Sequence, residues 1–125
     1  MAYNVLLVDD SVTVRAVMTK TLKIAQIPLG ELFTAGNGKE ALDVLKEKWV
    51  DLVITDLNMP EMTGFELVDA MFVHEQYKAI PVIVVTTEGS TTRIDDLKKK
   101  GVRGYVRKPF TPEQIGEMIT QVMGA

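Results

Sequence analysis

Five short apolar runs, separated by segments with helical periodicity, constrain the fold of this chain more than any other feature. Runs of this length that are rich in β-branched residues and end at turn formers are typical of buried strands. Three of them are apolar on both faces, which is typical of a parallel sheet covered by helices on both sides. The runs lie at residues 5–8, 32–35, 52–55, 82–85 and 104–106.

The segments between and after these runs carry apolar residues at i, i+3, i+4 and i+7, the spacing of a helix with one buried face. The last segment also begins with an N-cap at Thr111, a proline at the first helical position and a capping-box partner at Gln114. The segment near 92–100 has only Ile94 and Leu97 to bury, so we expect it to be the most loosely packed helix. The other buried stripes are Val14, Val17, Met18, Leu22 and Ala25; Ala41, Leu42 and Leu45; Val68, Met71 and Phe72; and Ile115, Met118, Ile119 and Val122.

Five β-α units joined by short connections predict an α/β fold. Parallel strands need right-handed crossovers, so the sheet should be doubly wound and lie between two layers of helices. At 125 residues the chain fits one domain, residues 1–125. We expect Trp49 to be a packing residue near the rim formed by the amino ends of the strands. We expect His74, the single histidine, to be exposed.

Polar side chains follow four of the five strands at their carboxyl ends, where ligands bind in folds of this kind. A parallel sheet brings these residues to one edge, although they are far apart in the sequence. After the second strand, Gly36-Asn37-Gly38 is typical of a helix start and carries no evident chemistry. The groups at the rim are Asp9-Asp10, Asp56, Thr86-Thr87-Glu88 and Arg107-Lys108-Pro109.

Three carboxylates at one rim repel one another unless a cation compensates them. Carboxylate oxygens without histidine or cysteine nearby suit Mg²⁺, an ion that also binds phosphate oxygens. A lysine and a threonine hydroxyl at the same rim would bind the same phosphate group. An aspartate can itself attack phosphorus, so these groups are the parts of a phosphoryl-transfer site. Taken singly, each has a simpler interpretation. Asp9 and Asp10 could cap the next helix together with Ser11, Asp56 could be a turn residue, and Lys108 could be a solvated side chain.

Composition argues against several other classes of protein. Without cysteine the chain can form neither a disulfide nor a thiolate metal site. A net charge of −3 argues against non-specific nucleic-acid binding. No apolar stretch approaches the ~20 residues of a membrane helix, residues 1–4 lack the features of a signal peptide, and no Walker-type glycine-rich loop is present. We therefore expect a cytoplasmic protein that binds neither nucleic acid nor a membrane.

Together, these residues resemble the receiver domain of two-component response regulators, and most of all the stand-alone chemotaxis regulators of the CheY type. The motifs that carry the resemblance are LLVDDS, ITDLNMPEMTG, VIVVTTEGS and GYVRKPF, in this order and at receiver spacing. The resemblance covers essentially the whole chain. It implies a flavodoxin-like fold with five helices and the strand order 2-1-3-4-5, an order that comes from the family.

The resemblance assigns the phosphoryl chemistry to residues at the rim. It makes Asp56 the phosphoacceptor, and it makes Thr86 and Lys108 the pair that senses the phosphoryl group. The Mg²⁺ ligands that it implies are Asp9, Asp10, Asp56 and the backbone carbonyl of Asn58.

Other roles that the resemblance implies concern switching and lifetime. Tyr105 would turn inward on activation, and Asn58 and Glu88 would tune the lifetime of the acyl phosphate. The peptide bond between Lys108 and Pro109 is expected to be cis. Two positions depart from the commonest receiver pattern: Thr87, often Ala or another small residue in the family, borders the path of the phosphodonor, and Thr63 replaces a frequent Asp.

The resemblance implies a signalling switch rather than an enzyme. A histidine kinase would donate the phosphoryl group, and the chain would catalyse only its own phosphorylation and dephosphorylation. Phosphate would then favour a state that binds a downstream protein, for which a flagellar motor switch is one candidate. The docking face would be the fourth helix, fifth strand and fifth helix, with the basic residues Lys98, Lys99, Lys100, Arg103 and Arg107.

The segment GVRGYVRKPF lacks the paired acids typical of receivers attached to winged-helix domains, so we expect a monomer of the chemotaxis type. Two alternatives stay open. One is a receiver excised from a larger response regulator or phosphorelay intermediate. The other is a phosphatase with an aspartate nucleophile, although such enzymes usually carry a second acid where this chain has Asn58.

Overall fold

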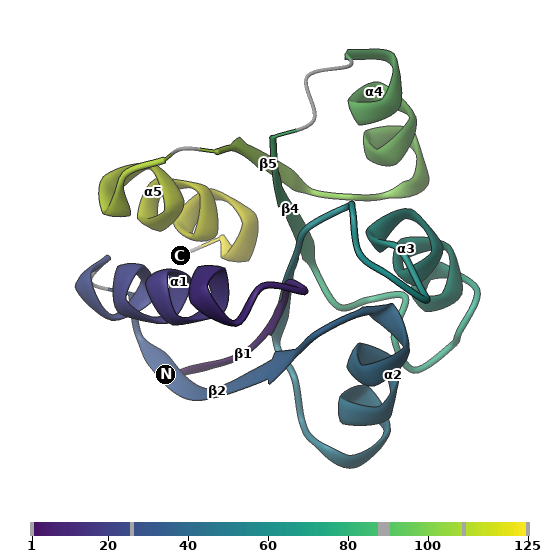
Figure 1. Cartoon of the computed structure of the whole chain (residues 1–125), viewed down its shortest axis with the longest axis horizontal. Helices are drawn as coiled ribbons and strands as arrows, with labels where there is room; N and C mark the ends of the chain where they lie inside the picture. Colours follow the sequence, from purple (N-terminus) through teal and green to yellow (C-terminus); the bar gives the residue numbers. More distant parts are fainter. Residues whose placement is uncertain (1, 26, 88–90, 109, 125) are drawn as a thin grey trace.

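The computed structural model describes residues 2–25, 27–87, 91–108 and 110–124, and it contains five consecutive β-α units (Figure 1). Strand β3 has the predicted bounds, and the other four strands are one to three residues longer than predicted. The strands are β1 (Tyr3–Val8), β2 (Leu29–Ala35), β3 (Leu52–Thr55), β4 (Val82–Thr86) and β5 (Gly104–Arg107). The helices are α1 (Val12–Ile24), α2 (Gly38–Glu47), α3 (Gly64–Phe72), α4 (Thr91–Lys100) and α5 (Pro112–Met123).

The strands form one parallel sheet in the order β2-β1-β3-β4-β5, as the resemblance implied. Strand β1 lies between β2 and β3, so the chain leaves β1 toward one edge of the sheet and later returns to its other side. Val8, the last residue of β1, pairs with Ala35 of β2 and with Thr55 of β3. The three strands therefore end at the same level, and the switch in strand order lies directly above that level.

Helices cover both faces of the sheet, because side chains alternate between the faces along each strand. In β1, Leu6 and Val8 belong to the core on the side of α2, α3 and α4, while Val5 and Leu7 belong to the core on the side of α1 and α5. Figure 1 shows the same division of the helices. Strands β1, β3 and β4 are buried on both faces, which is why their sequences are almost continuously apolar.

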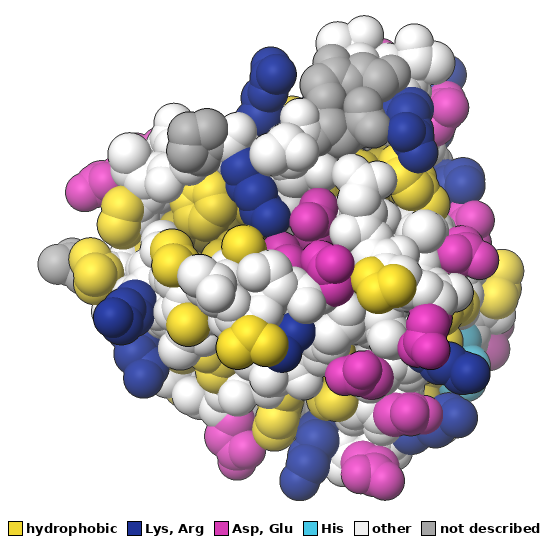
Figure 2. All heavy atoms as spheres, viewed as in Figure 1, with side chains coloured by type: hydrophobic (Ala, Val, Ile, Leu, Met, Phe, Trp, Pro, Cys, Tyr) yellow, Lys and Arg dark blue, Asp and Glu magenta, His cyan; other side chains and the backbone are white. Residues whose placement is uncertain are grey.

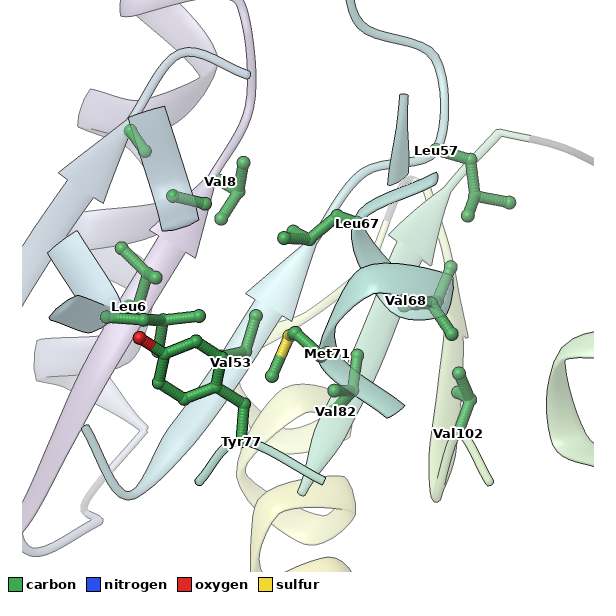
Figure 3. Packing of buried hydrophobic residues seen from close by; sticks show 14 of the residues in the cluster. Leu6, Val8, Val53, Leu57, Leu67, Val68, Met71, Tyr77, Val82 and Val102 are labelled. Carbon is green, nitrogen blue, oxygen red and sulfur yellow. The ribbon is translucent and has the colours of Figure 1, made fainter. Parts of the chain in front are cut away.

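The core on the side of α3 illustrates what holds a helix to the sheet. Leu67, Val68 and Met71 are spaced to share one face of α3, and all three are fully buried above Val53 and Val82 (Figure 3). Burying a side chain of this size contributes about 1.5–3 kcal/mol. The predicted stripe at Val68, Met71 and Phe72 is confirmed, with Phe72 half-buried against the same core.

The helix ends are fixed by local hydrogen bonds. The predicted N-cap at Thr111 is confirmed: its hydroxyl accepts a hydrogen bond from the Gln114 N–H, and the Gln114 side chain accepts one from the Thr111 N–H. Helix α3 begins with the same capping box, built from Thr63 and Glu66. Helix α4 buries only Ile94 and Leu97, as predicted. Among the described helices, none has the length and apolar character required to span a bilayer.

The prediction that Val17 and Trp49 are packing residues is wrong. Val17 is 58% exposed, because Met18 and Leu22 point to the sheet and Val17 lies about 100° from Met18 around the helix. Trp49 lies at the predicted rim but is 77% exposed, and its indole N–H donates a hydrogen bond to Asp51 instead of packing in the core. His74 is exposed as predicted and stacks on the ring of Tyr77.

A substitution at Gly64 tests how tightly the chain closes after β3. The Gly64 N–H donates a hydrogen bond to the Leu57 carbonyl, and a Cβ at position 64 would overlap the carbonyl oxygen of Asp56. We expect Gly64→Ala to lower the free energy of unfolding by about 3 kcal/mol, the upper end of the usual range. Gly36→Ala is the control, because its Cβ would meet only ordinary contacts at 3.4 Å. Urea unfolding that gives both variants the same stability would contradict this assignment.

Candidate functional site

Backbone hydrogen bonds beyond the ends of the strands position the central carboxylates. The Asp9 N–H donates to the Ala35 carbonyl at 3.0 Å, and the Asp56 N–H donates to the Val8 carbonyl at 2.9 Å. The sheet ladder thus continues for one residue after β1 and β3. Two residues that lie far apart in the sequence are therefore held side by side at the carboxyl rim, as the parallel arrangement predicted.

Asp9, Asp10 and Asp56 form an acidic cluster in which one carboxylate oxygen of each lies within 4.8 Å of the others. Asp9 is buried, Asp56 is half-buried and Asp10 is exposed. In the space-filling view, acidic side chains gather in the middle of this face, between α1 and α3, with basic side chains beside them (Figure 2). A group of oxygen ligands that opens to solvent on one side fits a hard divalent cation that keeps several waters.

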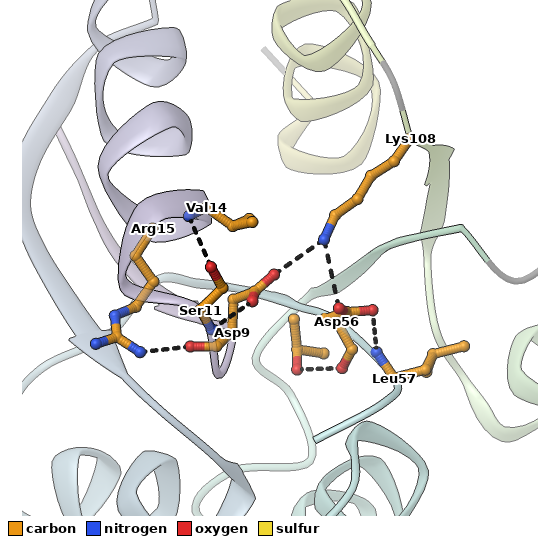
Figure 4. A network of polar contacts seen from close by, with 8 residues as sticks. Asp9, Ser11, Val14, Arg15, Asp56, Leu57 and Lys108 are labelled. Carbon is orange, nitrogen blue, oxygen red and sulfur yellow. Dashed lines mark hydrogen bonds and ion pairs between the residues drawn. The ribbon is translucent and has the colours of Figure 1, made fainter. Parts of the chain in front are cut away.

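Lys108, which directly follows β5, reaches into the acidic cluster from the β5 side of the sheet. Its Nζ lies 2.9 Å from Asp9 Oδ2 and 3.3 Å from Asp56 Oδ2 (Figure 4). The Lys108 N–H also donates to the Thr86 carbonyl at 2.9 Å, so β4 holds the backbone of the lysine in place. Burial alone lowers the pKa of Lys108, but hydrogen bonds and charge attraction from Asp9 and Asp56 outweigh this effect and raise the pKa above 10.5.

Hydrogen bonds from the backbone orient the two carboxylates that Lys108 contacts. Asp56 Oδ1 accepts a hydrogen bond from the Leu57 N–H at 2.7 Å, and Asp9 Oδ1 accepts one from the Ser11 N–H at 3.0 Å. Each carboxylate therefore turns its other oxygen, Oδ2, toward the ammonium group (Figure 4). The N-cap of α1 is Ser11, whose hydroxyl accepts a hydrogen bond from the Val14 N–H. The helix therefore does not need Asp10 as its cap, which was the simpler interpretation of this residue.

The remaining predicted residues lie around this cluster at different depths. Thr86 is fully buried at the end of β4, and Tyr105 is half-buried in β5, where it packs against the core on the side of α4. Asn58 is exposed in the loop between β3 and α3, two residues after Asp56. Glu88 and the peptide bond between Lys108 and Pro109 lie outside the described residues.

Three residues near the site were not singled out for a role by sequence reasoning. Arg15 donates a hydrogen bond from Nη1 to the Asp9 carbonyl, and Asn37 donates one from Nδ2 to Glu61 Oε2 at 3.0 Å. The sequence motif at Asn37 predicts the helix start that is observed, but it carries no sign of the second contact. A side chain that reaches another loop leaves no local pattern in the sequence.

An apolar groove of about 420 Å³ lies beside Lys108, between α1 and the start of α5. Val14, Val17 and Met18 line it from α1, and Phe110 and Thr87 line it from the opposite side. Val17, which was predicted to be buried, instead lines this groove with its exposed side chain. Thr87 is exposed there, at the position where sequence reasoning placed the path of a phosphodonor.

Comparison with known proteins agrees with this fold. The family of response regulator receiver domains matches residues 5–120, and the chain belongs to this family. The CheY homolog of Campylobacter jejuni, a chemotaxis protein, is 40% identical over 97% of this chain and 92% of its own length. The chemotaxis protein CheY1 of Helicobacter pylori is 37% identical over 97% of each chain. The structure of the chemotaxis response regulator CheY4 of Vibrio cholerae has a TM-score of 0.86 and 38% identity, and the match covers 98% of this chain and 99% of that one.

Replacing Lys108 tests whether its charge balances the acidic cluster. In Lys108→Met the carboxylates lose their cation, and we expect the metal-free protein to lose about 1–2 kcal/mol of unfolding free energy, a figure reduced for partial solvent access. The same change should tighten binding of a divalent cation severalfold, because the ammonium group no longer competes for the oxygens. Urea unfolding and a Mg²⁺ titration measure the two effects, with the exposed Lys20→Met as control. Unchanged values in Lys108→Met would contradict the assignment.

The raised pKa of Lys108 also predicts how this contribution depends on pH. A cationic group whose pKa is higher in the folded state stabilises the fold fully below its unfolded pKa and loses that effect as the pH rises through the folded value. The stability difference between wild type and Lys108→Met should therefore stay constant from neutral pH upward and shrink only above pH 10.5. If the stability difference between wild type and Lys108→Met disappeared near neutral pH, the raised pKa of Lys108 would be contradicted.

Proposed function

We propose that this protein is a chemotaxis-type response regulator that accepts a phosphoryl group on Asp56 and then binds a protein target. The observation that carries this proposal is the position of Lys108 Nζ, which lies within 3.3 Å of both Asp9 and Asp56 at the carboxyl rim. Family membership and the chemotaxis relatives at 37–40% identity support it. The donor would be a histidine kinase, and we place the protein in the cytoplasm as a monomer.

The acidic cluster provides the ligands for Mg²⁺ in this proposal. Asp9, Asp10 and Asp56 would hold the ion together with the backbone carbonyl of Asn58, and the carboxylate chemistry of the cluster fits it. The ion would neutralise charge on the phosphoryl oxygens during transfer. Asp9 and Asp56 are held by backbone hydrogen bonds, so two of the oxygen ligands are in place before any ion binds.

Transfer needs one nucleophilic oxygen and one nearby cation from the chain itself. A carboxylate oxygen of Asp56 would attack the phosphorus of a phosphohistidine. The new P–O bond forms as the P–N bond breaks, and the electron pair of that bond returns to the imidazole. Lys108 would then leave its carboxylate partners and pair with a phosphoryl oxygen, while Thr86 donates a hydrogen bond from its hydroxyl group. Asn58 and Glu88 would tune the later attack of water and keep the acyl phosphate short-lived.

The output face in this proposal consists of α4, β5 and α5. Helix α4 buries only Ile94 and Leu97, so a shift of this helix disturbs few apolar contacts. Movement of Thr86 and Lys108 toward the phosphoryl group would open space into which Tyr105 could turn. The basic residues predicted for this face are Lys98, Lys99, Arg103 and Arg107, all exposed, and Lys100, which is also exposed and pairs with Asp69 of α3 at 2.8 Å. The same helices also carry the exposed acids Asp95, Asp96, Glu113 and Glu117.

The positive charge at the output face predicts the chemistry of its partner. An acidic or amphipathic peptide would be attracted by these side chains, and the attraction should weaken as the salt concentration rises. A component of a flagellar motor switch is one candidate for this partner.

Phosphorylation of Asp56 can be tested directly by intact-mass measurement. Incubation with a small phosphodonor and Mg²⁺ should add one phosphoryl group to the wild-type protein. Asp56→Asn should abolish the addition, because an amide is a far poorer nucleophile and carries no charge to hold the metal. Asp43→Asn, on the exposed face of α2, is the matched control and should be phosphorylated normally. Equal labelling of Asp56→Asn and wild type would overturn the proposed mechanism.

The link between Asp56 and the output face is tested with the phosphate analogue BeF₃⁻. The wild-type protein should bind its partner more tightly when BeF₃⁻ and Mg²⁺ are present, and Thr86→Ala and Tyr105→Ala should lose most of this gain. Tyr3→Ala, at the opposite end of the sheet, is the control for loss of a tyrosine. If both Thr86→Ala and Tyr105→Ala keep the full gain, the signal does not pass through these residues.

A further inference from the structure

The loop between β3 and α3, which contains Asn58, is held by backbone hydrogen bonds at two places. At its base, the hydrogen bond from the Gly64 N–H to the Leu57 carbonyl closes the loop directly beside Asp56. At its far side, the Gly38 N–H donates to the Met62 carbonyl at 3.0 Å. A Cβ at Gly38 would lie 2.8 Å from Cγ of Met62, so a larger residue there would require the Met62 side chain to shift.

Glu61, at the tip of this loop, has a backbone conformation that residues with a side chain rarely adopt. Its φ is 61°, and it is the one non-glycine residue with positive φ in the described part of the chain. Such a conformation is unfavourable for a residue with a Cβ and persists where the surroundings hold it. The contact that holds the side chain of Glu61 is the hydrogen bond from Asn37 Nδ2 to Glu61 Oε2, at 3.0 Å.

Asn37 is well placed to act as a fixed anchor. It is only 6% exposed, and its two side-chain atoms have separate tasks. Oδ1 accepts a hydrogen bond from the Glu40 N–H and so caps α2, whereas Nδ2 points to the carboxylates of Glu61 and Glu40. The loop of Asn37 follows directly after Ala35, the last residue of β2, whose carbonyl accepts the hydrogen bond from the Asp9 N–H. One side chain therefore connects the segment beside Asp9 with the segment that follows Asp56.

We propose that the hydrogen bond between Asn37 and Glu61 is a clasp that positions the loop of Asn58 for metal binding and phosphorylation. The inference rests on the proposed function, in which the Asn58 carbonyl is a ligand of Mg²⁺. Asn37 and Glu61 are positioning residues here, because neither would touch the ion or the phosphoryl group. By holding Glu61 in its unfavourable conformation, the clasp keeps the loop in one arrangement before the ion arrives, so less order has to be created on binding.

The test uses variants that remove the clasp but keep the fold. Asn37→Ser keeps an N-cap oxygen for α2 and lacks the amide donor. Glu61→Gly lacks the carboxylate, and glycine adopts positive φ without strain, so its stability should stay close to that of wild type. Glu61→Gln is the conservative variant, because its amide oxygen can still accept from Asn37. Asp51→Asn, at the opposite rim, serves as the control for a general loss of polar contacts.

Three quantities are measured for each variant: the dissociation constant for Mg²⁺, the rate of phosphorylation by a small phosphodonor at a fixed subsaturating Mg²⁺ concentration, and amide hydrogen exchange of residues 57–62 without metal. We expect Asn37→Ser and Glu61→Gly each to weaken Mg²⁺ binding roughly tenfold, the low end of the effect of residues that support metal ligands. The double variant should be no weaker than either single one, because both remove the same contact. Exchange in the loop should be faster in all three, and Glu61→Gln should recover most of the affinity.

Two results would overturn the clasp. One is a Mg²⁺ affinity within twofold of wild type in Asn37→Ser and Glu61→Gly, and the other is a double variant in which the two losses simply add. These outcomes are distinct from failure of the proposed function. If wild type binds Mg²⁺ and is phosphorylated on Asp56 but the variants behave like it, only the clasp is wrong. If wild type itself shows no Mg²⁺ binding at the acidic cluster, the proposed function fails first.

Discussion

The backbone ladder of the parallel sheet is the constraint on which the site depends. Three hydrogen bonds beyond the strand ends hold the backbones of Asp9, Asp56 and Lys108, at 3.0, 2.9 and 2.9 Å. Each joins a site residue to the neighbouring strand, so the groups cannot separate unless the sheet itself opens. The buried side chains of β1, β3 and β4 prevent that opening, because they pack against helices on both faces. The core thereby determines the geometry of a polar site at its edge.

The same constraint brings like charges together. Asp9, Asp10 and Asp56 would separate in water, and the fold holds their oxygens within 4.8 Å. Lys108 compensates this repulsion in the absence of metal, which is why the carboxylates raise its pKa despite its burial. An arrangement in which one cation is shared by two of three clustered acids responds strongly to any further charge. A divalent ion or a phosphoryl group placed there changes the partners of Lys108, and this change is the proposed start of the signal.

The helices differ in how firmly they are held, and the difference is suited to a switch. Helix α3 is fixed by several fully buried side chains, whereas α4 buries only two. Polar contacts add to the attachment of α4 to α3: Lys100 pairs with Asp69 at 2.8 Å, and the guanidinium of Arg93 lies 4.2 Å from the ring centre of Phe65. Contacts of this exposed kind are individually weak. Few strong contacts would therefore oppose the shift of helix α4 that the proposed switch requires.

The sequence by itself determined the five β-α units, the capping box at Thr111 and the rim that collects Asp9, Asp56 and Lys108, because these follow from local periodicity and from the direction of parallel strands. The strand order had to come from resemblance, since no local pattern encodes which strands are neighbours. The exposure of Val17 and Trp49, the shared contacts of Lys108 and the bond between Asn37 and Glu61 were decided by tertiary structure alone. Each depends on where a second, distant segment lies, and a side chain carries no sign in the sequence of the partner that folding brings to it.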